Sequence, residues 1–115
     1  MRRGELIEFV VHGVRYAFPA TRGGIGRGVP TSIAADPLRE AFAGAGDDPL
    51  RTPVWPHPEG TALGYAIDPL YRTVPDVAPQ IKTFYALLTL TDALREGRAR
   101  ERGLAADLIR TRLSP

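Results

Sequence analysis

Proline constrains the fold of this chain more than any other residue type, because eleven of the 115 residues are proline. Proline has no backbone N–H and a fixed φ angle, which largely excludes it from helix interiors and from central strands. Four prolines crowd the segment 45–60: Pro49, Pro53, Pro56 and Pro58. We therefore expect this segment to be a loop that contains no helix and no central strand.

The longest apolar pattern predicts a helix that begins at Asp76 or Ala78 and runs to about Glu96. Pro79 would fall in its first turn, where proline is tolerated. Apolar side chains cover more than one face of this helix, which predicts a central core element. These side chains belong to Ile81, Phe84, Tyr85, Leu87, Leu88, Leu90 and Leu94.

Gly97 interrupts this pattern, and an amphipathic helix follows to residue 113. Its inward positions are Ala105, Leu108, Ile109 and Leu113, with its arginines outward. Residues 76–113 therefore predict a helical hairpin. We expect four side chains to be buried together where its two helices pack: Phe84, Leu87, Leu88 and Leu108.

Residues 1–20 fit two structures, because their apolar side chains follow helical spacing but also alternate as in a strand. We favour a short helix that ends at Gly13, followed by a strand over 14–18. The alternative is a hairpin that turns at His12 and Gly13.

Two shorter elements complete the expected fold. Asp36 as N-cap and Pro37 at the first helical position predict a short helix that ends at Gly44. Residues 61–67 read as a strand. The sequence thus predicts a small single α+β domain over residues 1–115, with short strands or a hairpin packed on the C-terminal helical hairpin and a loop-rich middle.

Composition excludes several chemistries. The chain has no cysteine, which suits a reducing cytoplasm, and no segment long enough to span a membrane. Two histidines, His12 and His57, lack the spacing of a metal site, and neither Ser32 nor Ser114 lies in a nucleophile motif. We therefore expect no metal, no cofactor and no catalytic residue.

A stretch rich in glycine and arginine, "TRGGIGRG", follows the first twenty residues. Its glycine spacing fits neither a phosphate-binding loop nor a dinucleotide-binding turn, and no lysine follows. We expect Gly23 to Gly28 to form a mobile crossing. The alternative is that Arg22 and Arg27 clamp a phosphate or an acidic partner.

A basic run, "LREGRARER", joins the two predicted C-terminal helices. Glu96 and Glu101 stand three or four residues from its arginines, so a solvated face is the preferred interpretation. The alternative is a binding surface for nucleic acid or for a partner protein. Its arginines are Arg95, Arg98, Arg100 and Arg102.

Trp55 lies in the proline-rich segment and has two possible roles. It would fasten this segment to the core, which we favour because the segment has little else apolar. The alternative is an exposed anchor for a partner protein, a role that also suits tryptophan.

Several motifs together resemble one protein family: "EFVVHGVRYAFPA", "RGVPT", "VWPHPEG", "GYAIDPLYRTVP" and "DALREGRARERGLA". They are similar to the C-terminal part of uncharacterised bacterial regulators in which a MarR-like helix-turn-helix precedes this region. On that resemblance the DNA-reading helices would lie before Met1, and residues 5–13 would match the helix that follows them.

The resemblance implies a non-enzymatic regulatory or interaction protein, related to helix-turn-helix transcriptional regulators. We expect it to bind a partner protein, as a component of a toxin–antitoxin or defence operon. The alternative is a protein that binds nucleic acid through the glycine–arginine stretch and the arginine-rich helices.

Overall fold

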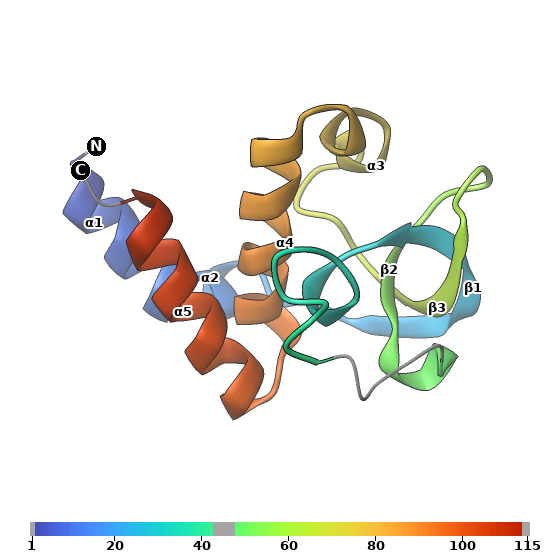
Figure 1. Cartoon of the computed structure of the whole chain (residues 1–115), viewed down its shortest axis with the longest axis horizontal. Coiled ribbons are helices and arrows are strands. Elements are labelled where there is room, and N and C mark those ends of the chain that lie inside the picture. The colour runs from blue at the N-terminus through green and yellow to red at the C-terminus, as the bar shows by residue number, and fades with distance from the viewer. Residues whose placement is uncertain (1, 43–47, 114–115) are drawn as a thin grey trace.

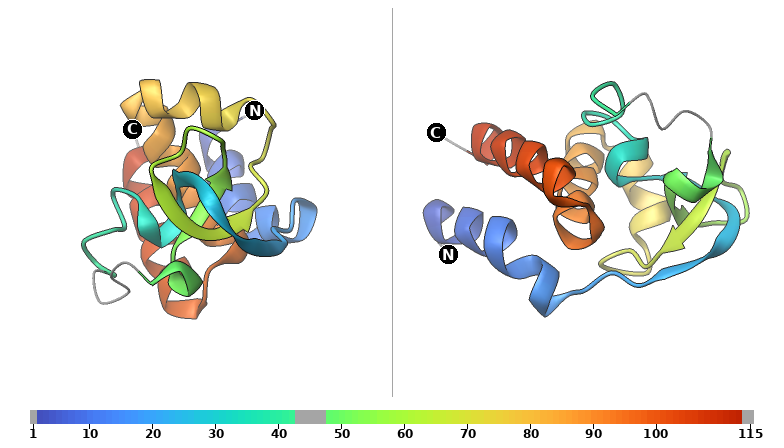
Figure 2. Two further views of the ribbon diagram at one scale, coloured as in Figure 1. Left: turned by 90° about the vertical axis from the view of Figure 1, so that its right-hand side faces the viewer. Right: turned by 90° about the horizontal axis from the view of Figure 1, so that it is seen from below.

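A computed structural model describes residues 2–42 and 48–113 of the chain. Helix α4 (Lys82–Glu96) stands between a helical layer and a three-stranded sheet that closes into a small barrel (Figures 1 and 2). In the helical layer, α1 (Arg3–Glu8) lies against α5 (Ala99–Leu113). The predicted α+β class, with strands packed on a C-terminal helical hairpin, is confirmed.

Helices α4 and α5 run in opposite directions and form the predicted hairpin (Figure 1). One face of α4 packs on α5 and on the N-terminal residues. This first core contains Val14, Leu38, Leu90, Ala93, Leu94, Ala105, Ala106 and Ile109. The opposite face of α4 meets a second core, made of Trp55, Tyr65, Ile67, Val74 and Ala78. Helix α4 is therefore the central element, as its apolar pattern predicts.

The predicted group of four core side chains is only half right. Leu87 and Leu108 pack at the edge of the first core. Phe84 is 39% exposed, and Leu88 packs against the second core instead. The error arises because α4 is apolar on two faces, and the sequence does not say which face meets α5.

The chain enters α4 differently from the prediction. A single turn, α3 (Val74–Val77), is followed by a 3-10 turn (Ala78–Gln80) and by extended backbone at Ile81, with φ −126° and ψ 98°. A start at Asp76 or Ala78 is therefore wrong. The extended backbone of Ile81 separates the 3-10 turn from α4, so the long helix begins only at Lys82.

The N-terminal residues are helical throughout. We call this segment the N-terminal helix; it consists of α1, a π-helical turn (Phe9–Gly13) and α2 (Val14–Ala17). The predicted strand over 14–18 and the alternative hairpin are both wrong. Gly13 keeps right-handed backbone at φ −111° and does not end the helix. A Cβ atom there would lie 3.1 Å from the Phe9 ring, so this glycine makes room for the ring.

The barrel consists of β1 (Arg22–Pro30), β2 (Pro53–Pro56) and β3 (Ala62–Ile67). Strand β1 pairs antiparallel with both others, which pair parallel to each other. Strand β3 confirms the prediction for residues 61–67. The mobile crossing predicted for Gly23 to Gly28 is wrong, because these residues form most of β1. A Cβ atom on Gly28 would lie 2.3 Å from the Trp55 carbonyl oxygen, so glycine here allows the strands to approach.

Strand β2 lies inside the segment predicted to be a loop, of which residues 45–47 lie outside the described ranges. The prolines occupy its two ends and leave the N–H groups of Val54 and Trp55 between them. Proline also keeps its carbonyl, and the Pro53 oxygen accepts the Thr31 N–H at 3.0 Å. The density of prolines excludes a long strand but not a short one.

The helix predicted from Asp36 does not form. Residues 36–42 make isolated turns, in which the Leu38 N–H donates to the Ala35 carbonyl at 3.0 Å. Leu38 is fully buried in the first core, and this tertiary packing overrides the local helix signal. Gly44, its predicted end, lies outside the described residues. Two 3-10 turns, Ser32–Ala34 and Pro49–Arg51, flank this region.

Candidate functional site

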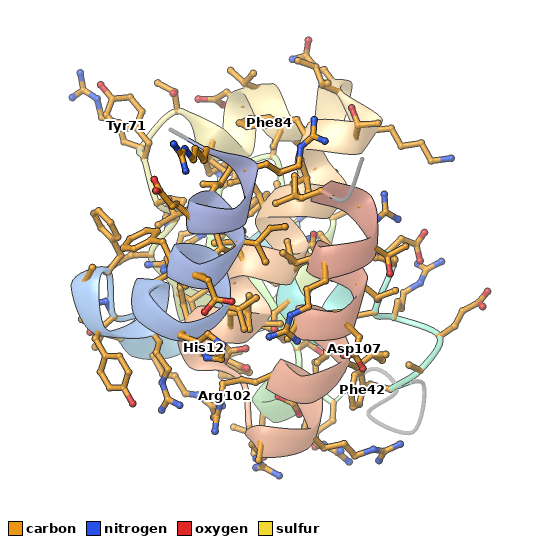
Figure 3. The ribbon with its side chains drawn as sticks, turned by 90° about the vertical axis from the view of Figure 1, so that its left-hand side faces the viewer. His12, Phe42, Tyr71, Phe84, Arg102 and Asp107 are labelled. Atoms are coloured by element: carbon orange, nitrogen blue, oxygen red, sulfur yellow. The ribbon has the colours of Figure 1, made fainter. Side chains whose placement is uncertain are left out.

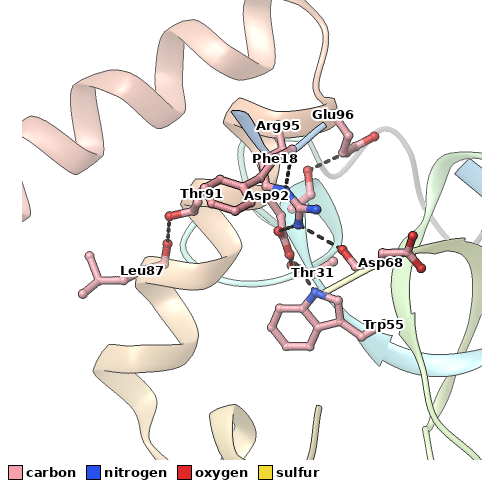
Figure 4. Close-up of polar contacts among 10 residues, drawn as sticks. Phe18, Thr31, Trp55, Asp68, Leu87, Thr91, Asp92, Arg95 and Glu96 are labelled. Atoms are coloured by element: carbon pink, nitrogen blue, oxygen red, sulfur yellow. Dashed lines mark hydrogen bonds and ion pairs between the residues drawn. The ribbon is translucent and has the colours of Figure 1, made fainter. Parts of the chain in front are cut away.

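Polar side chains near the end of α4 face the barrel. The Asp92 carboxylate is 1% exposed and accepts three hydrogen bonds (Figure 4). Its Oδ2 atom accepts from Thr31 Oγ1 at 2.6 Å and from Trp55 Nε1 at 2.7 Å, and Oδ1 accepts from Arg95 Nη1 at 2.7 Å. We define the polar junction as Arg22, Thr31, Ser32, Trp55, Tyr65, Asp92, Arg95 and Glu96.

Arg95 is part of this junction and not of a surface. Besides Asp92, its guanidinium donates to the Phe18 carbonyl at 2.8 Å and to the Asp68 carbonyl at 2.9 Å. Its side chain is 3% exposed. The alternative role of Arg95 as a partner- or nucleic-acid-binding residue is therefore wrong. The residue instead ties the end of the N-terminal helix and the end of β3 to α4.

Glu96, one turn after Asp92, repeats the same arrangement. Its carboxylate accepts from Ser32 Oγ at 2.8 Å and from the Tyr65 hydroxyl at 3.0 Å. Arg22 Nη2 donates to it at 3.2 Å, and the Arg22 guanidinium lies 4.5 Å from the centre of the Tyr65 ring. The Arg22 side chain is still 48% exposed. Arg22 is thus largely neutralised but accessible.

Burial controls ionisation in the junction. It raises the pKa of the Asp92 carboxyl, while the hydrogen bond from Thr31 and the charge of Arg95 oppose this shift. Burial and then the charge of Glu96 raise the pKa of the Tyr65 phenol. Tyr65 therefore stays protonated and continues to donate to Glu96.

Trp55 confirms the favoured interpretation. It is fully buried, and its ring centre lies 5.6 Å from that of Tyr85 on α4. The side chain fastens β2 to the core, so the alternative of an exposed partner anchor is wrong.

The remaining predicted binding arginines are not gathered into one patch. Arg102 donates to the Gly97 carbonyl at 2.6 Å, where it closes the end of α4. The Arg100 guanidinium lies 5.3 Å from the centre of the Phe42 ring. Within the described ranges, the guanidiniums of Arg27 and Arg98 have no hydrogen-bonding or ion-pairing partner.

A shallow hollow brings two predicted residues together. Arg22 and Arg98 line it with Arg51, which sequence reasoning missed, and its volume is about 20 Å³. Glu101 also lines it and accepts the Arg98 backbone N–H at 3.0 Å, as a cap at the start of α5. No motif around Arg51 signals this position, because the pairing of three distant segments creates it.

The N-terminal helix, which His12 marks in Figure 3, and Phe18 directly after it expose apolar side chains that the sequence did not predict. We define the exposed face as Leu6, Phe9, Tyr16 and Phe18, which are 37%, 40%, 76% and 51% exposed. The Phe9 and Phe18 rings pack edge to face with centres 6.5 Å apart, and the Arg15 guanidinium lies 5.3 Å from the Tyr16 ring centre. Val14 lies in the first core, and Val10 and Val11 pack against that core.

A larger groove of about 560 Å³ opens between the turn after β1, the start of α4 and the end of α5. Tyr85 forms part of its wall, and its hydroxyl donates to the Pro30 carbonyl. Asp36 and Arg39 stand on its rim, with Arg39 Nε 3.9 Å from Asp36 Oδ1.

His57 and Asp76 form the pair most similar to catalytic machinery. His57 Nε2 lies 2.7 Å from Asp76 Oδ1, and His57 Nδ1 accepts the Glu59 N–H at 3.1 Å. Both ring nitrogens are therefore engaged, and neither is available to activate a nucleophile. Over residues 2–42 and 48–113, no three acidic or histidine side chains meet where they could hold a metal ion.

No helix in the described part of the chain is long and apolar enough to cross a membrane. Comparison of the chain with protein-family models, with curated proteins and with solved structures found no match.

Proposed function

We propose that this chain is a non-enzymatic interaction module of a regulatory system, and that it binds a second copy of itself through the exposed face. The observation that carries the proposal is the exposure of Leu6, Phe9 and Tyr16 on the N-terminal helix and of Phe18 directly after it, with the Phe9 and Phe18 rings in contact. Aromatic residues are enriched where protein surfaces meet, and contiguous exposed apolar side chains mark interaction sites.

The charges around the exposed face favour a second copy as the partner. The N-terminal helix carries Arg3, Glu5 and Glu8 in its first half and Arg15 in its second half, and His12 Nε2 lies 3.7 Å from Glu8 of the same helix. An antiparallel pairing centred on Val10 sets Glu5 opposite Arg15 of the other copy. Opposite charges at the rim of an apolar interface favour this register and disfavour the parallel one.

Sedimentation velocity on the full chain tests the proposal. We expect the unchanged chain to form a dimer at micromolar concentration, and Tyr16→Ser and Phe9→Ser to shift it toward monomer. Tyr16 is 76% exposed, so its replacement should not disturb the fold even if that of Phe9 does.

Leu63→Ser is the matched control, because Leu63 is 57% exposed on β3, away from the N-terminal helix. It should dimerise like the unchanged chain. A monomeric unchanged chain at these concentrations, or a dimer that Tyr16→Ser and Phe9→Ser leave intact, would contradict the proposal.

Nucleic-acid binding is a second candidate function. The observation that favours it is the hollow where Arg22, Arg51 and Arg98 converge from three segments. Guanidiniums in such a group suit phosphate oxygens. Against it, Glu96 and Glu101 lie among these cations, and no aromatic side chain beside the hollow is free to stack on a base, since Tyr65 is buried.

A further inference from the structure

The groove between β1, α4 and α5 has the size of a small-molecule site. Its volume of about 560 Å³ falls within the usual range of roughly 300 to 1,000 Å³ for ligand pockets. Its lining comes from the end of β1, the turn that follows it, the residue Pro79, the first turns of α4 and the last turn of α5. Three segments that are distant in sequence, residues 30–39, residues 79–86 and Arg112, thus line one open groove.

The chemistry of the groove is divided between wall and rim. Prolines, alanines and the Tyr85 ring form an apolar wall. The rim carries three cations and one carboxylate: Arg39, Lys82, Arg112 and Asp36. Asp36 stands 3.9 Å from Arg39, which leaves Lys82 and Arg112 without a charged partner among the described residues. The rim therefore has two positive charges in excess.

We propose that this groove binds a small organic carboxylate, with its apolar body against Tyr85 and its anionic head group between Lys82 and Arg112. An apolar wall favours a ligand body that water solvates poorly. Two uncompensated cations favour a negative head group and disfavour an amine. A long polyanion is disfavoured, because the cations stand around one groove and the Asp36 carboxylate is among them.

The single tryptophan offers a direct signal for binding. The Tyr85 ring that lines the groove is packed against Trp55, with ring centres 5.6 Å apart. Trp55 is the only tryptophan of the chain and is fully buried. A ligand that shifts Tyr85 should therefore change tryptophan fluorescence without touching Trp55 itself.

Titration of the full chain with 4-phenylbutanoate, followed by tryptophan fluorescence and by calorimetry, tests the proposal. The neutral 4-phenylbutanamide has the same body and is the matched ligand. We expect saturable binding of the carboxylate and affinity lower by at least about tenfold for the amide, since hydrogen bonds to a charged group are the stronger ones.

Two changes to the protein separate the head group from the body. Lys82→Gln with Arg112→Gln should lower the affinity for the carboxylate by about tenfold or more and leave the affinity for the amide unchanged. Ala86→Leu, whose larger side chain would occupy part of the groove, should lower the affinity for both ligands. Arg51→Gln with Arg98→Gln is the control, because these exposed cations lie outside the groove.

Equal affinity for carboxylate and amide, or carboxylate binding that survives the Lys82 and Arg112 changes, would overturn the proposal. So would the absence of saturable binding at millimolar ligand. The result is independent of self-association, because the exposed face contributes no residue to the groove. Tyr16→Ser should bind the carboxylate as the unchanged chain does, whatever its oligomeric state.

Discussion

The polar junction and the exposed face reverse the roles that their residue types suggest. The junction is rich in charged and polar side chains, yet Asp92 and Arg95 are buried in the middle of the molecule. The exposed face is apolar and aromatic, yet it lies on the surface of the N-terminal helix and of Phe18, which follows it. Polarity alone therefore does not tell which residues of this chain are available to a partner.

The difference has a physical cause. Each buried carboxylate of α4 accepts three hydrogen bonds from side chains of the barrel, of the residues directly after β1 or of α4 itself, which offsets the cost of removing it from water. The exposed face has no such compensation, because nothing in the described chain covers it. A buried polar group with all its hydrogen bonds made stabilises the fold, whereas an apolar surface that nothing covers is available to a partner.

The largest expected effect is on the junction. Asp92→Ala removes the acceptor for Thr31, Trp55 and Arg95 and leaves the Arg95 charge buried without its counter-ion. We expect the free energy of unfolding in urea to fall by about 3 to 5 kcal/mol. Asp107→Ala is the control, since its exposed carboxylate lies 3.9 Å from Arg110 and contributes at most about 1 kcal/mol. A change from Asp92→Ala as small as that of the control would mean that the junction does not hold the barrel to α4.

A smaller effect concerns alkaline pH. Burial, and then the negative charge of Asp36, raises the pKa of Tyr85 to about 12, above the usual value of 10.0. A pKa raised by folding means that the protonated phenol stabilises the fold; this contribution is complete below pH 10 and is lost as pH rises through 12.

We therefore expect the unchanged chain to lose more stability than Tyr85→Phe over that interval, as measured by urea unfolding at pH values below 10 and near 12. Tyr16→Phe, on the exposed face, should behave like the unchanged chain. Parallel curves for the unchanged chain and Tyr85→Phe would contradict the assignment.

The smallest expected effect is that of the unpaired cations. Arg27→Gln with Arg98→Gln should change the free energy of unfolding by no more than about 0.5 kcal/mol, because both are surface substitutions. If dimerisation is the function, these changes should also leave self-association intact. Titration with duplex and single-stranded DNA at two salt concentrations tests the second candidate function, nucleic-acid binding. Salt-sensitive binding that the double change weakens across unrelated sequences would favour nucleic acid.

The sequence predicted those parts of the fold that repeat a pattern. The helical hairpin, the inward positions of α5 and strand β3 follow from apolar periodicity over several turns or residues. The strands β1 and β2 were missed, because Gly28 and Pro53 signal irregular backbone until a neighbouring strand uses the space or the carbonyl that they offer. The N-terminal helix was missed beyond Gly13 for the same reason, because the sequence does not distinguish a glycine that makes room for a ring from one that ends a helix.

The candidate sites depend even more on tertiary contacts. Arg22 and Arg98 were identified by residue type. Arg95 stands in the same basic run as Arg98 but is buried, because its position on α4 faces the barrel and not the solvent. No local pattern distinguishes these arginines. The groove and the exposed face involve residues such as Lys82 and Tyr16 that have no motif. The groove follows from the packing of α4 and α5, and the exposed face from the side of the N-terminal helix that the core leaves uncovered.

The most direct test of the central claim, that the exposed face pairs antiparallel with a second copy, is a charge exchange between Glu5 and Arg15. Glu5→Arg alone and Arg15→Glu alone each set like charges opposite one another in a homodimer. A mixture of the two variants restores both opposite-charge pairs. We predict by sedimentation velocity that each variant alone is shifted toward monomer and that the equimolar mixture recovers the dimer. Variants that dimerise alone as strongly as the unchanged chain, or a mixture that remains monomeric, would contradict the antiparallel pairing.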